Sequence, residues 1–116
     1  MRAGIKYDSG KPIWSLLPYD ALAYVVKVMM FGASKYGAGN WRRLEDAPDR
    51  YFSALMRHVV AWRNGERLDP ETLRPHLAHA ATNAIFPSWF ELKALKLVKS
   101  HAVKMSLISK PKYKKI

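Results

Sequence analysis

The stretch RYFSALMRHVVAWRNGERLDPETLRPHLAHAATNAIF, residues 50–86, decides the fold. Along both of its halves the apolar side chains recur every three or four residues, the spacing of a helix with one buried face. In the first half they are Phe52, Leu55, Val59 and Trp62, and in the second half Leu77, Ala80, Ala81, Ala84 and Ile85. Asn64-Gly65 ends the first helix and Pro75 suits the start of the next. We therefore predict an antiparallel helical hairpin and an all-α fold, a small helical bundle built on that hairpin.

The connecting turn of this hairpin, GERLDPET, lies among histidines and acids. His76 and His79 are three residues apart, so their Cβ atoms lie about 5–6 Å apart on one helical face. Two imidazoles at that spacing can share a cation or a phosphate oxygen, and acids in the turn would add the oxygen ligands that Mg²⁺ or Mn²⁺ prefers. The candidate catalytic residues are His58, Glu66, His76 and His79, and the candidate metal ligands are Glu66, Asp69, His76 and His79.

Each of these residues also has a structural alternative. A single histidine on a helix, such as His58, is commonly a hydrogen-bonded structural residue. Glu66 and Asp69 can serve as a helix terminus and an N-cap. A mixed set of imidazole and carboxylate ligands favours Mn²⁺, Zn²⁺ or another transition metal over Mg²⁺.

Upstream of the hairpin the sequence predicts one more helix. Pro18 suits its first turn, and Gly37 and Gly39 end it. Its predicted buried stripe is Leu22, Val26, Met29 and Ala33. Residues 1–17 are irregular and favour a turn or a brief edge strand, and Asp46 ahead of Pro48 marks the start of the first hairpin helix.

The segment FGASKYGAGNWRR, residues 31–43, is predicted to be a loop that can bind a nucleotide. Aromatic faces stack on bases, while Lys and Arg side chains bind phosphates. The candidate nucleotide-binding and phosphate-binding residues are Lys35, Tyr36, Asn40, Trp41 and Arg42 in this segment, Arg57 and Asn83 on the hairpin, and Lys6, Asp8 and Lys11 in KYDSGKP. The glycine spacing of a Walker phosphate-binding loop is missing. In the alternative interpretation Trp41 simply covers the core.

Beyond the hairpin the chain becomes strongly basic. Pro87 predicts a kink or a restart of the helix, followed by an amphipathic segment, WFELKALKLVKSHAVKM. The net charge is +11, and residues 92–116 contribute +8 of it through eight lysines and no acid. We expect a lysine-rich C-terminal helix or tail there. It can be a solvated end, an oligomerisation helix or a nucleic-acid contact.

Composition excludes several classes of protein. The chain has no cysteine, which removes disulfides, thiolate zinc sites and cysteine nucleophiles. No apolar run reaches the ~18–20 residues that span a bilayer, and the first residues lack the apolar centre of a signal peptide. We expect a cytoplasmic protein without a membrane partner.

Six blocks occur in one order: KYDSGKP, LLPYDAL, FGASKYGAGNW, RHVVAWRNGE, LDPET and PHLAHAATNA. Together, over about residues 4–91, they resemble the phage-associated family named for dATP/dGTP diphosphohydrolase, a relative of the all-α MazG-type nucleotide pyrophosphatases. The resemblance implies residues 1–91 as a MazG-like nucleotide-binding domain, residues 92–116 as a separate tail, and a fold that oligomerises. It also implies hydrolysis of a nucleoside triphosphate to monophosphate and pyrophosphate, in the host-cell cytoplasm if the chain is phage-encoded.

MazG-like enzymes hold divalent metal with an ExxE pair on one helix and an ExxD pair on the next. In this chain RHVVAWRNGE stands where the first pair would be, and His76-Leu77-Ala78-His79 where the second would be. Either the metal has moved to the histidines and turn acids, or the fold binds a nucleotide or a nucleotide-derived signal without catalysis. The leading prediction is metal-dependent hydrolysis of purine deoxynucleoside triphosphates for nucleotide-pool metabolism. The alternatives are that non-catalytic binding protein and a basic protein that binds nucleic acid or a protein partner through its tail.

Overall fold

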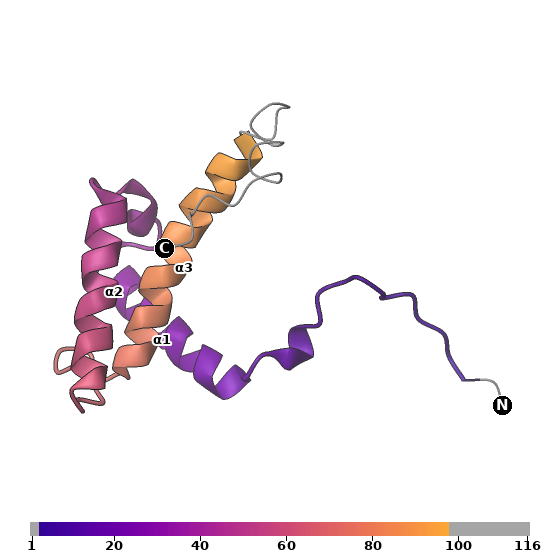
Figure 1. Ribbon diagram of the computed structural model, residues 1–116, viewed down its shortest axis with the longest axis horizontal. Helices are drawn as coiled ribbons and strands as arrows, with labels where there is room; N and C mark the ends of the chain where they lie inside the picture. Colours follow the sequence, from indigo (N-terminus) through magenta and orange to yellow (C-terminus); the bar gives the residue numbers. More distant parts are fainter. Residues whose placement is uncertain (1–2, 98–116) are drawn as a thin grey trace, which may run out of the picture.

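The computed structural model describes residues 3–97, which form three α-helices and two short 3-10 helices (Figure 1). Helix α1 spans Tyr19–Tyr36, α2 spans Ala47–Arg63 and α3 spans His76–Leu97, while the 3-10 helices η1 and η2 are Trp14–Leu16 and Asn40–Arg43. Residues 3–97 contain no strand, only an isolated antiparallel bridge between Leu68 and Pro75. The predicted all-α class is therefore confirmed. Most of the predicted lysine-rich tail, residues 98–116, lies outside the described residues.

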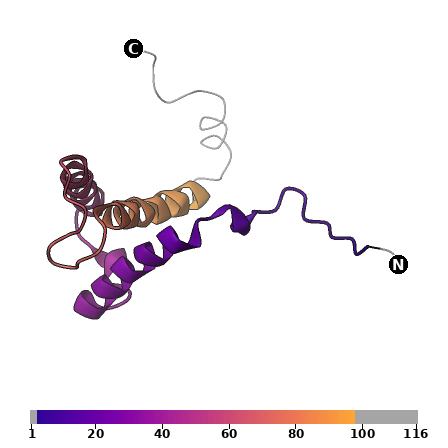
Figure 2. The ribbon, with the colours of Figure 1, turned by 90° about the horizontal axis from the view of Figure 1, so that it is seen from below.

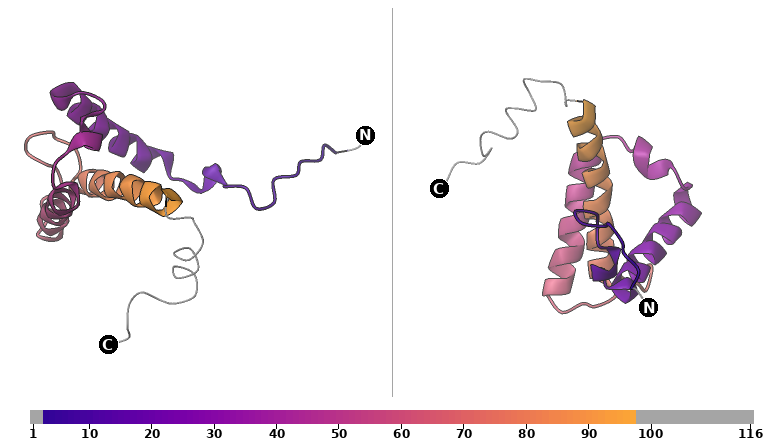
Figure 3. Two further views of the ribbon diagram at one scale, coloured as in Figure 1. Left: turned by 90° about the horizontal axis from the view of Figure 1, so that it is seen from above. Right: turned by 90° about the vertical axis from the view of Figure 1, so that its right-hand side faces the viewer.

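Helices α2 and α3 form the predicted hairpin, side by side and antiparallel (Figures 1 and 3). The first helix ends at Arg63, directly before Asn64-Gly65, and Gly65 takes the positive φ of 97° that favours glycine. The turn then closes on itself, because the His76 backbone N–H donates to the Arg67 carbonyl at 3.0 Å. This closure brings the turn acids beside the first residues of α3.

Helix α1 packs against α3, and the two helices bury Val25, Val28 and Ala78 between them. The predicted stripe on α1 is wrong at one position, since Val26 is 47% exposed while its neighbour Val25 is buried. Periodicity gives a helix a buried face, but the neighbouring helix selects which of two adjacent valines belongs to it.

The hairpin helices show the same small rotation of their buried faces. On α2, Phe52 is 61% exposed and Tyr51 is buried in its place. On α3, Ala80 is buried as predicted, but Leu77 and Ile85 of the predicted face are exposed and Ala78 is buried instead. Small side chains at the contact let two helices approach closely, which turns the larger aliphatic residues outward.

Two predictions about where helices end are corrected within residues 3–97. Helix α3 continues through Pro87 without restarting, so the predicted fourth helical segment is its last part and the helix crosses the predicted boundary at residue 91. Aromatic residues on both sides of Pro87 contact Trp41, and this packing supports the turn that lacks one backbone hydrogen bond. The predicted loop over residues 31–43 is also partly wrong, since it contains the end of α1 and all of η2.

The segment that precedes α1, residues 3–17, is called here the N-terminal arm. It leads away from the three helices (Figure 2). The predicted turn is present, because the Lys11 backbone N–H donates to the Asp8 carbonyl at 3.0 Å, and the predicted edge strand is absent from residues 3–17. None of the helices that the structure describes is long and apolar enough to cross a membrane.

Candidate functional site

One large cavity, of about 760 Å³, lies between α1, α2, α3 and the segment that joins α1 to α2. It is called here the nucleotide cavity. Nine residues that the sequence singles out line it: Lys35, Tyr36, Asn40, Trp41, Arg57, His58, Asp69, His79 and Asn83. Four polar residues that sequence reasoning missed line it as well: Arg50, Glu71, Thr72 and Thr82. The hairpin and the glycine-rich segment therefore face one common space.

Three histidines meet where α2 faces the first turn of α3, and they are called here the histidine cluster. His58 lies against both others: its Nδ1 is 2.9 Å from His76 Nδ1, and its ring stacks on His79 at 4.3 Å with an interplanar angle of 9°. The spacing of His76 and His79 predicted that both would share a face. The partner on α2 comes from the antiparallel pairing of the helices.

His76 is the most buried residue of the cluster, at 3% exposure, and both of its ring nitrogens have partners. Its Nε2 lies 2.6 Å from Glu66 Oε1. A carboxylate only accepts hydrogen bonds, so Nε2 carries the proton, and in the neutral ring Nδ1 carries the lone pair. The proton shared with His58 Nδ1 is therefore donated by His58. A cation can take the place of that proton between the two rings.

Asp69 is held by the turn that it caps. Its Oδ2 accepts from the Thr72 backbone N–H at 2.9 Å, the Glu71 backbone N–H at 3.1 Å and Thr72 Oγ1 at 3.2 Å. Burial raises the pKa of Asp69, but the hydrogen bonds from Thr72 outweigh it and the net pKa is lowered. The N-cap alternative is thus a real part of its role, and its bonds within residues 3–97 use Oδ2 and not Oδ1.

Thr72 links this aspartate to the histidine cluster. Its hydroxyl proton goes to Asp69, so its oxygen accepts from His79 Nε2 at 2.7 Å. That bond fixes the tautomer of His79 and leaves Nδ1 with the lone pair. Sequence reasoning missed Thr72, although its position three residues after Asp69 is the spacing of a capping interaction.

The environment keeps His58 and His79 neutral. Desolvation, and after it the neighbouring His79, lower the pKa of His58 to about 4. Desolvation also lowers the pKa of His79, against the opposing effect of Asp69. Neutral imidazoles are the form that binds metal ions.

The ligand atoms of His58, Asp69 and His76 lie within 4.8 Å of one another, close enough to hold one metal ion. This set differs from the predicted ligands. His58 belongs to it, whereas Glu66 lies at the far nitrogen of His76 and His79 is bonded to Thr72. A carboxylate behind a ligating histidine orients the ring and raises its basicity. The donor chemistry therefore fits a metal ion with Glu66 as an outer partner.

Basic residues line the nucleotide cavity on the side of α1 and α2. Lys35 Nζ lies 2.7 Å from Glu71 Oε2, and this exposed pair raises the pKa of the lysine. Arg50 and Arg57 line the cavity from α2. Arg42 does not line it, because its guanidinium lies over the Trp41 and Trp89 rings, 4.9 and 5.2 Å from their centroids.

Trp41 belongs to an aromatic cluster at the end of the hairpin remote from the turn. Its ring stacks on Phe86 at 4.4 Å with an interplanar angle of 7°, and it meets the edges of Trp89 and Phe90. The Tyr51 hydroxyl donates to the Trp41 carbonyl at 2.7 Å and anchors η2 on α2. The alternative interpretation, in which Trp41 covers the core, thus describes its packing, and Trp41 also lines the cavity.

A family model described as dATP/dGTP diphosphohydrolase, N-terminal, matches residues 1–100. The chain belongs to this family. A relative named dATP/dGTP diphosphohydrolase, from Salmonella phage PMBT28, is 37% identical over 86 residues, which are 74% of this chain and 29% of the relative. The chain thus spans less than a third of that relative's length. No solved structure matches it.

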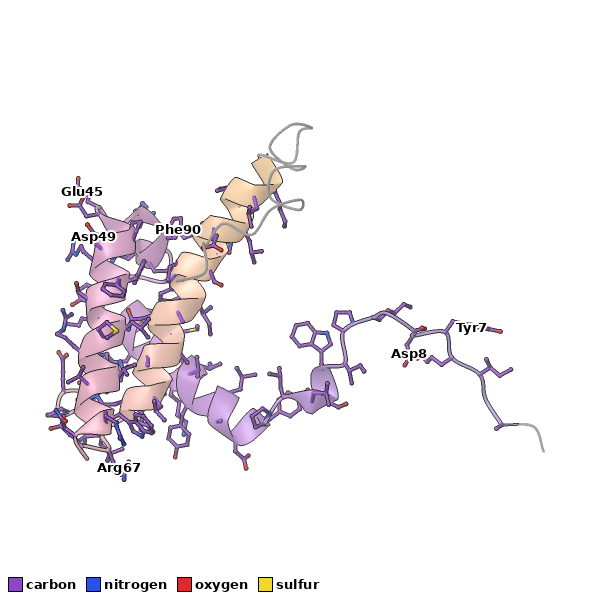
Figure 4. The ribbon with its side chains drawn as sticks, in the orientation of Figure 1. Tyr7, Asp8, Glu45, Asp49, Arg67 and Phe90 are labelled. Atoms are coloured by element: carbon purple, nitrogen blue, oxygen red, sulfur yellow. The ribbon has the colours of Figure 1, made fainter. Side chains whose placement is uncertain are left out.

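The family match includes the N-terminal arm and its three predicted phosphate-binding residues, Lys6, Asp8 and Lys11. The structure does not bring these residues to the nucleotide cavity of the same chain. They lie on the exposed arm, far from the hairpin, as the labelled Asp8 shows (Figure 4). In this family member the arm and the cavity are separate parts of one chain.

Proposed function

We propose that this chain hydrolyses purine deoxynucleoside triphosphates to the monophosphate and pyrophosphate, with a divalent metal, in the nucleotide cavity. The observation that carries the proposal is that one cavity is lined both by His58 and Asp69, which belong to the candidate metal group, and by the basic residues Lys35 and Arg57. Metal ligands and phosphate-binding cations around one space are what phosphoryl transfer requires. The name of the phage relative, dATP/dGTP diphosphohydrolase, supports purine deoxynucleotides as substrates.

His58 Nδ1, His76 Nδ1 and Asp69 Oδ1 are the atoms that would hold the metal. The two Nδ1 atoms face each other 2.9 Å apart, so both could bind one ion. Two imidazoles and one carboxylate favour Mn²⁺ or another transition metal over Mg²⁺. When bound, the metal polarises a phosphoryl oxygen and lowers the pKa of a water molecule.

Side chains of the nucleotide cavity accept the proton, neutralise charge and hold the nucleoside in the proposed reaction. A water oxygen bonds to the α-phosphorus, the bond from that phosphorus to the oxygen bridging to the β-phosphate breaks, and pyrophosphate leaves with the electron pair. His79, whose Nδ1 has a free lone pair, accepts the proton from the water. Lys35, Arg50 and Arg57 neutralise the charge that grows on the leaving pyrophosphate. Tyr36, Asn40 and Asn83 contact the nucleoside. In a phage-infected cell this activity would act on the nucleotide pool of the host cytoplasm.

The test is pyrophosphate release from a panel of nucleoside triphosphates by metal-stripped protein, with and without added Mn²⁺, Zn²⁺ or Mg²⁺. We expect release from dATP and dGTP that requires metal and is fastest with Mn²⁺. His58→Ala should lower the rate at least ~100-fold, whereas Met56→Ala, an exposed residue on the same helix, should leave it unchanged. No release with any metal and nucleotide would refute the enzyme, and tight calorimetric binding without release would establish the binding protein instead.

A further inference from the structure

The N-terminal arm is an apolar feature that the proposed function leaves unexplained. Its side chains stand in solvent: Tyr7 is 84% exposed, Leu16 79% and Trp14 68% (Figure 4). Covering apolar surface is favourable by about 25 cal/mol per Å², and a patch of several large side chains marks an interaction site. Because the family model begins at residue 1, the arm is part of the domain that the family shares.

A matching surface lies where α1 begins and meets the start of α3. It is a second cavity, of about 360 Å³, called here the apolar groove, and apart from the Tyr24 hydroxyl its side chains are wholly apolar. Leu22 and Val25 line it from α1, and Leu77 and Ile85 from α3. The last two are 45% and 43% exposed, so the groove is open to a partner.

The apolar groove and the nucleotide cavity are lined by the same two helices, α1 and α3. Val25 and Ala78 line the groove, while the next residues along the two helices, Val26 and His79, line the cavity. In the arm, Lys11 precedes Trp14 by three residues and Lys6 by eight, which in an extended chain is about 10 Å and about 26 Å. An arm that holds Trp14 in the groove is therefore long enough for its lysines to reach a cavity that shares the same two helices.

The charges are complementary as well. A triphosphate carries several negative charges, and within residues 3–97 one of the cavity's cations, Lys35, is already paired with Glu71. Lys6 and Lys11 lie on the exposed arm before the start of α1, whereas α1 lines the cavity only from Val26 onward. Two further cations from another chain would balance the ligand.

We propose that the arm of one copy crosses to a second copy of this chain, places Ile13, Trp14 and Leu16 in its apolar groove, and supplies Lys6 and Lys11 to its nucleotide cavity. The role of the lysines rests on the proposed function, whereas the contact between copies does not. Each cavity is complete only in the assembled protein. A two-fold symmetric pair satisfies both arms at once.

The contact is tested by sedimentation of the full chain, which does not depend on turnover. The wild-type chain should assemble, and Trp14→Asp should weaken association at least ~10-fold because it places a charge in the apolar groove. Phe52→Asp changes an equally exposed aromatic residue on α2 and should leave assembly intact. A wild-type chain that stays monomeric at about 100 µM, or a Trp14→Asp variant that assembles normally, would overturn the proposal.

Sharing of the site is tested by mixing two inactive variants. K6A/K11A keeps the cavity and lacks the lysines, whereas His76→Ala keeps the lysines and lacks the metal site; each alone should lose at least ~10-fold in kcat/KM. After mixing and reassembly, half of the pairs are mixed and each has one intact site, so about a quarter of the wild-type activity should return. If mixed pairs form but no activity returns, the two copies do not share a site. If the wild-type chain is itself inactive, the proposed function is refuted instead.

Discussion

The two ends of the α2–α3 hairpin are built in opposite ways. Near the turn, His58, His76 and His79 are held mainly by hydrogen bonds between specific polar atoms, with the rings of His58 and His79 stacked. At the other end, Trp41 and Phe86 stack within an aromatic cluster that depends on shape and apolar area. The helices that connect the ends are the same, so the difference lies entirely in the side chains that the pairing brings together.

This difference separates stability from chemistry. Burying a polar group costs free energy unless its polar atoms form hydrogen bonds. The hydrogen bonds of the histidine cluster therefore largely offset the cost of burying it and add little net stability. Aromatic rings bury large areas and gain about 0.5–1.5 kcal/mol more from their mutual geometry. We therefore expect variants at the aromatic end to unfold the protein and variants at the histidine end to change its metal affinity.

The largest expected effect is that of Trp41→Ala. Removing the ring that contacts Phe86, Trp89 and Phe90 should lower the free energy of unfolding by about 3 kcal/mol, roughly a 150-fold change in the unfolding constant. Urea unfolding measures it, and Phe52→Ala, which truncates an exposed aromatic residue, should change it by less than about 0.5 kcal/mol. Equal losses in both variants would break the comparison, since the aromatic cluster would then not be special.

The converse prediction concerns Glu66→Ala. Removing the carboxylate that orients His76 should weaken Mn²⁺ binding about 10–100-fold, as measured by calorimetry on metal-stripped protein. The free energy of unfolding without metal should change by less than for Trp41→Ala. Glu45→Ala, an exposed acid before α2, is the control and should leave metal binding unchanged. If Glu66→Ala left metal binding intact, Glu66 would be a hydrogen-bond partner of His76 with no part in metal binding.

The sequence predicts the two ends unequally. The hairpin follows from periodicity, Asn64-Gly65 and Pro75, and it places His58 opposite His76 and His79 because antiparallel helices must meet. The stack of Trp41 on Phe86 does not follow, because the two residues are far apart in sequence and nothing local fixes how α1 is joined to α2. The choice of Val25 over Val26 is set by α3 in the same way.

The site shows the same division. The residue types of the nucleotide cavity were predictable as a set, since most of them come from the hairpin and the glycine-rich segment. The separate roles of the three histidines could not be predicted, because they depend on which ring nitrogen faces which neighbour. Asp69 and Thr72 illustrate this: their spacing predicts a cap, but only the folded turn shows that Thr72 also receives the His79 bond.

As the pH falls, protonation of the histidine cluster should lower the free energy of unfolding before protonation of Asp69 does. The folded pKa of His58, about 4, lies below its unfolded value of about 6.5, so the unfolded chain binds more protons between these values. The free energy of unfolding should therefore fall as pH decreases from about 6.5 to about 4, by about 1 kcal/mol once solvent screening of this partly exposed ring is allowed for. The lowered pKa of His79 acts in the same direction below pH 6.5, and that of Asp69 acts at still lower pH.

Urea midpoints measured in chelator across that range test the sign. His58→Gln removes the group with the largest shift and should flatten the slope between pH 6.5 and 4, while Phe52→Ala should keep it. A wild-type chain that gains stability as the pH falls would show that the histidines are not desolvated in the folded state.

The smallest expected effect is that of the pair between Lys35 and Glu71, which joins the end of α1 to the turn of the hairpin. Both side chains are exposed, at 44% and 62%, so solvent screens their attraction and the entropy of holding two long side chains offsets it. A double-mutant cycle of Lys35→Ala and Glu71→Ala should give a coupling energy of about 0.5 kcal/mol or less, and added salt should remove it. A coupling near about 2 kcal/mol would require that the pair be desolvated. Lys35 and Glu71 would then close the cavity beside the histidine cluster before any ligand binds. The turn end of the hairpin would also stabilise the fold, as the aromatic end does.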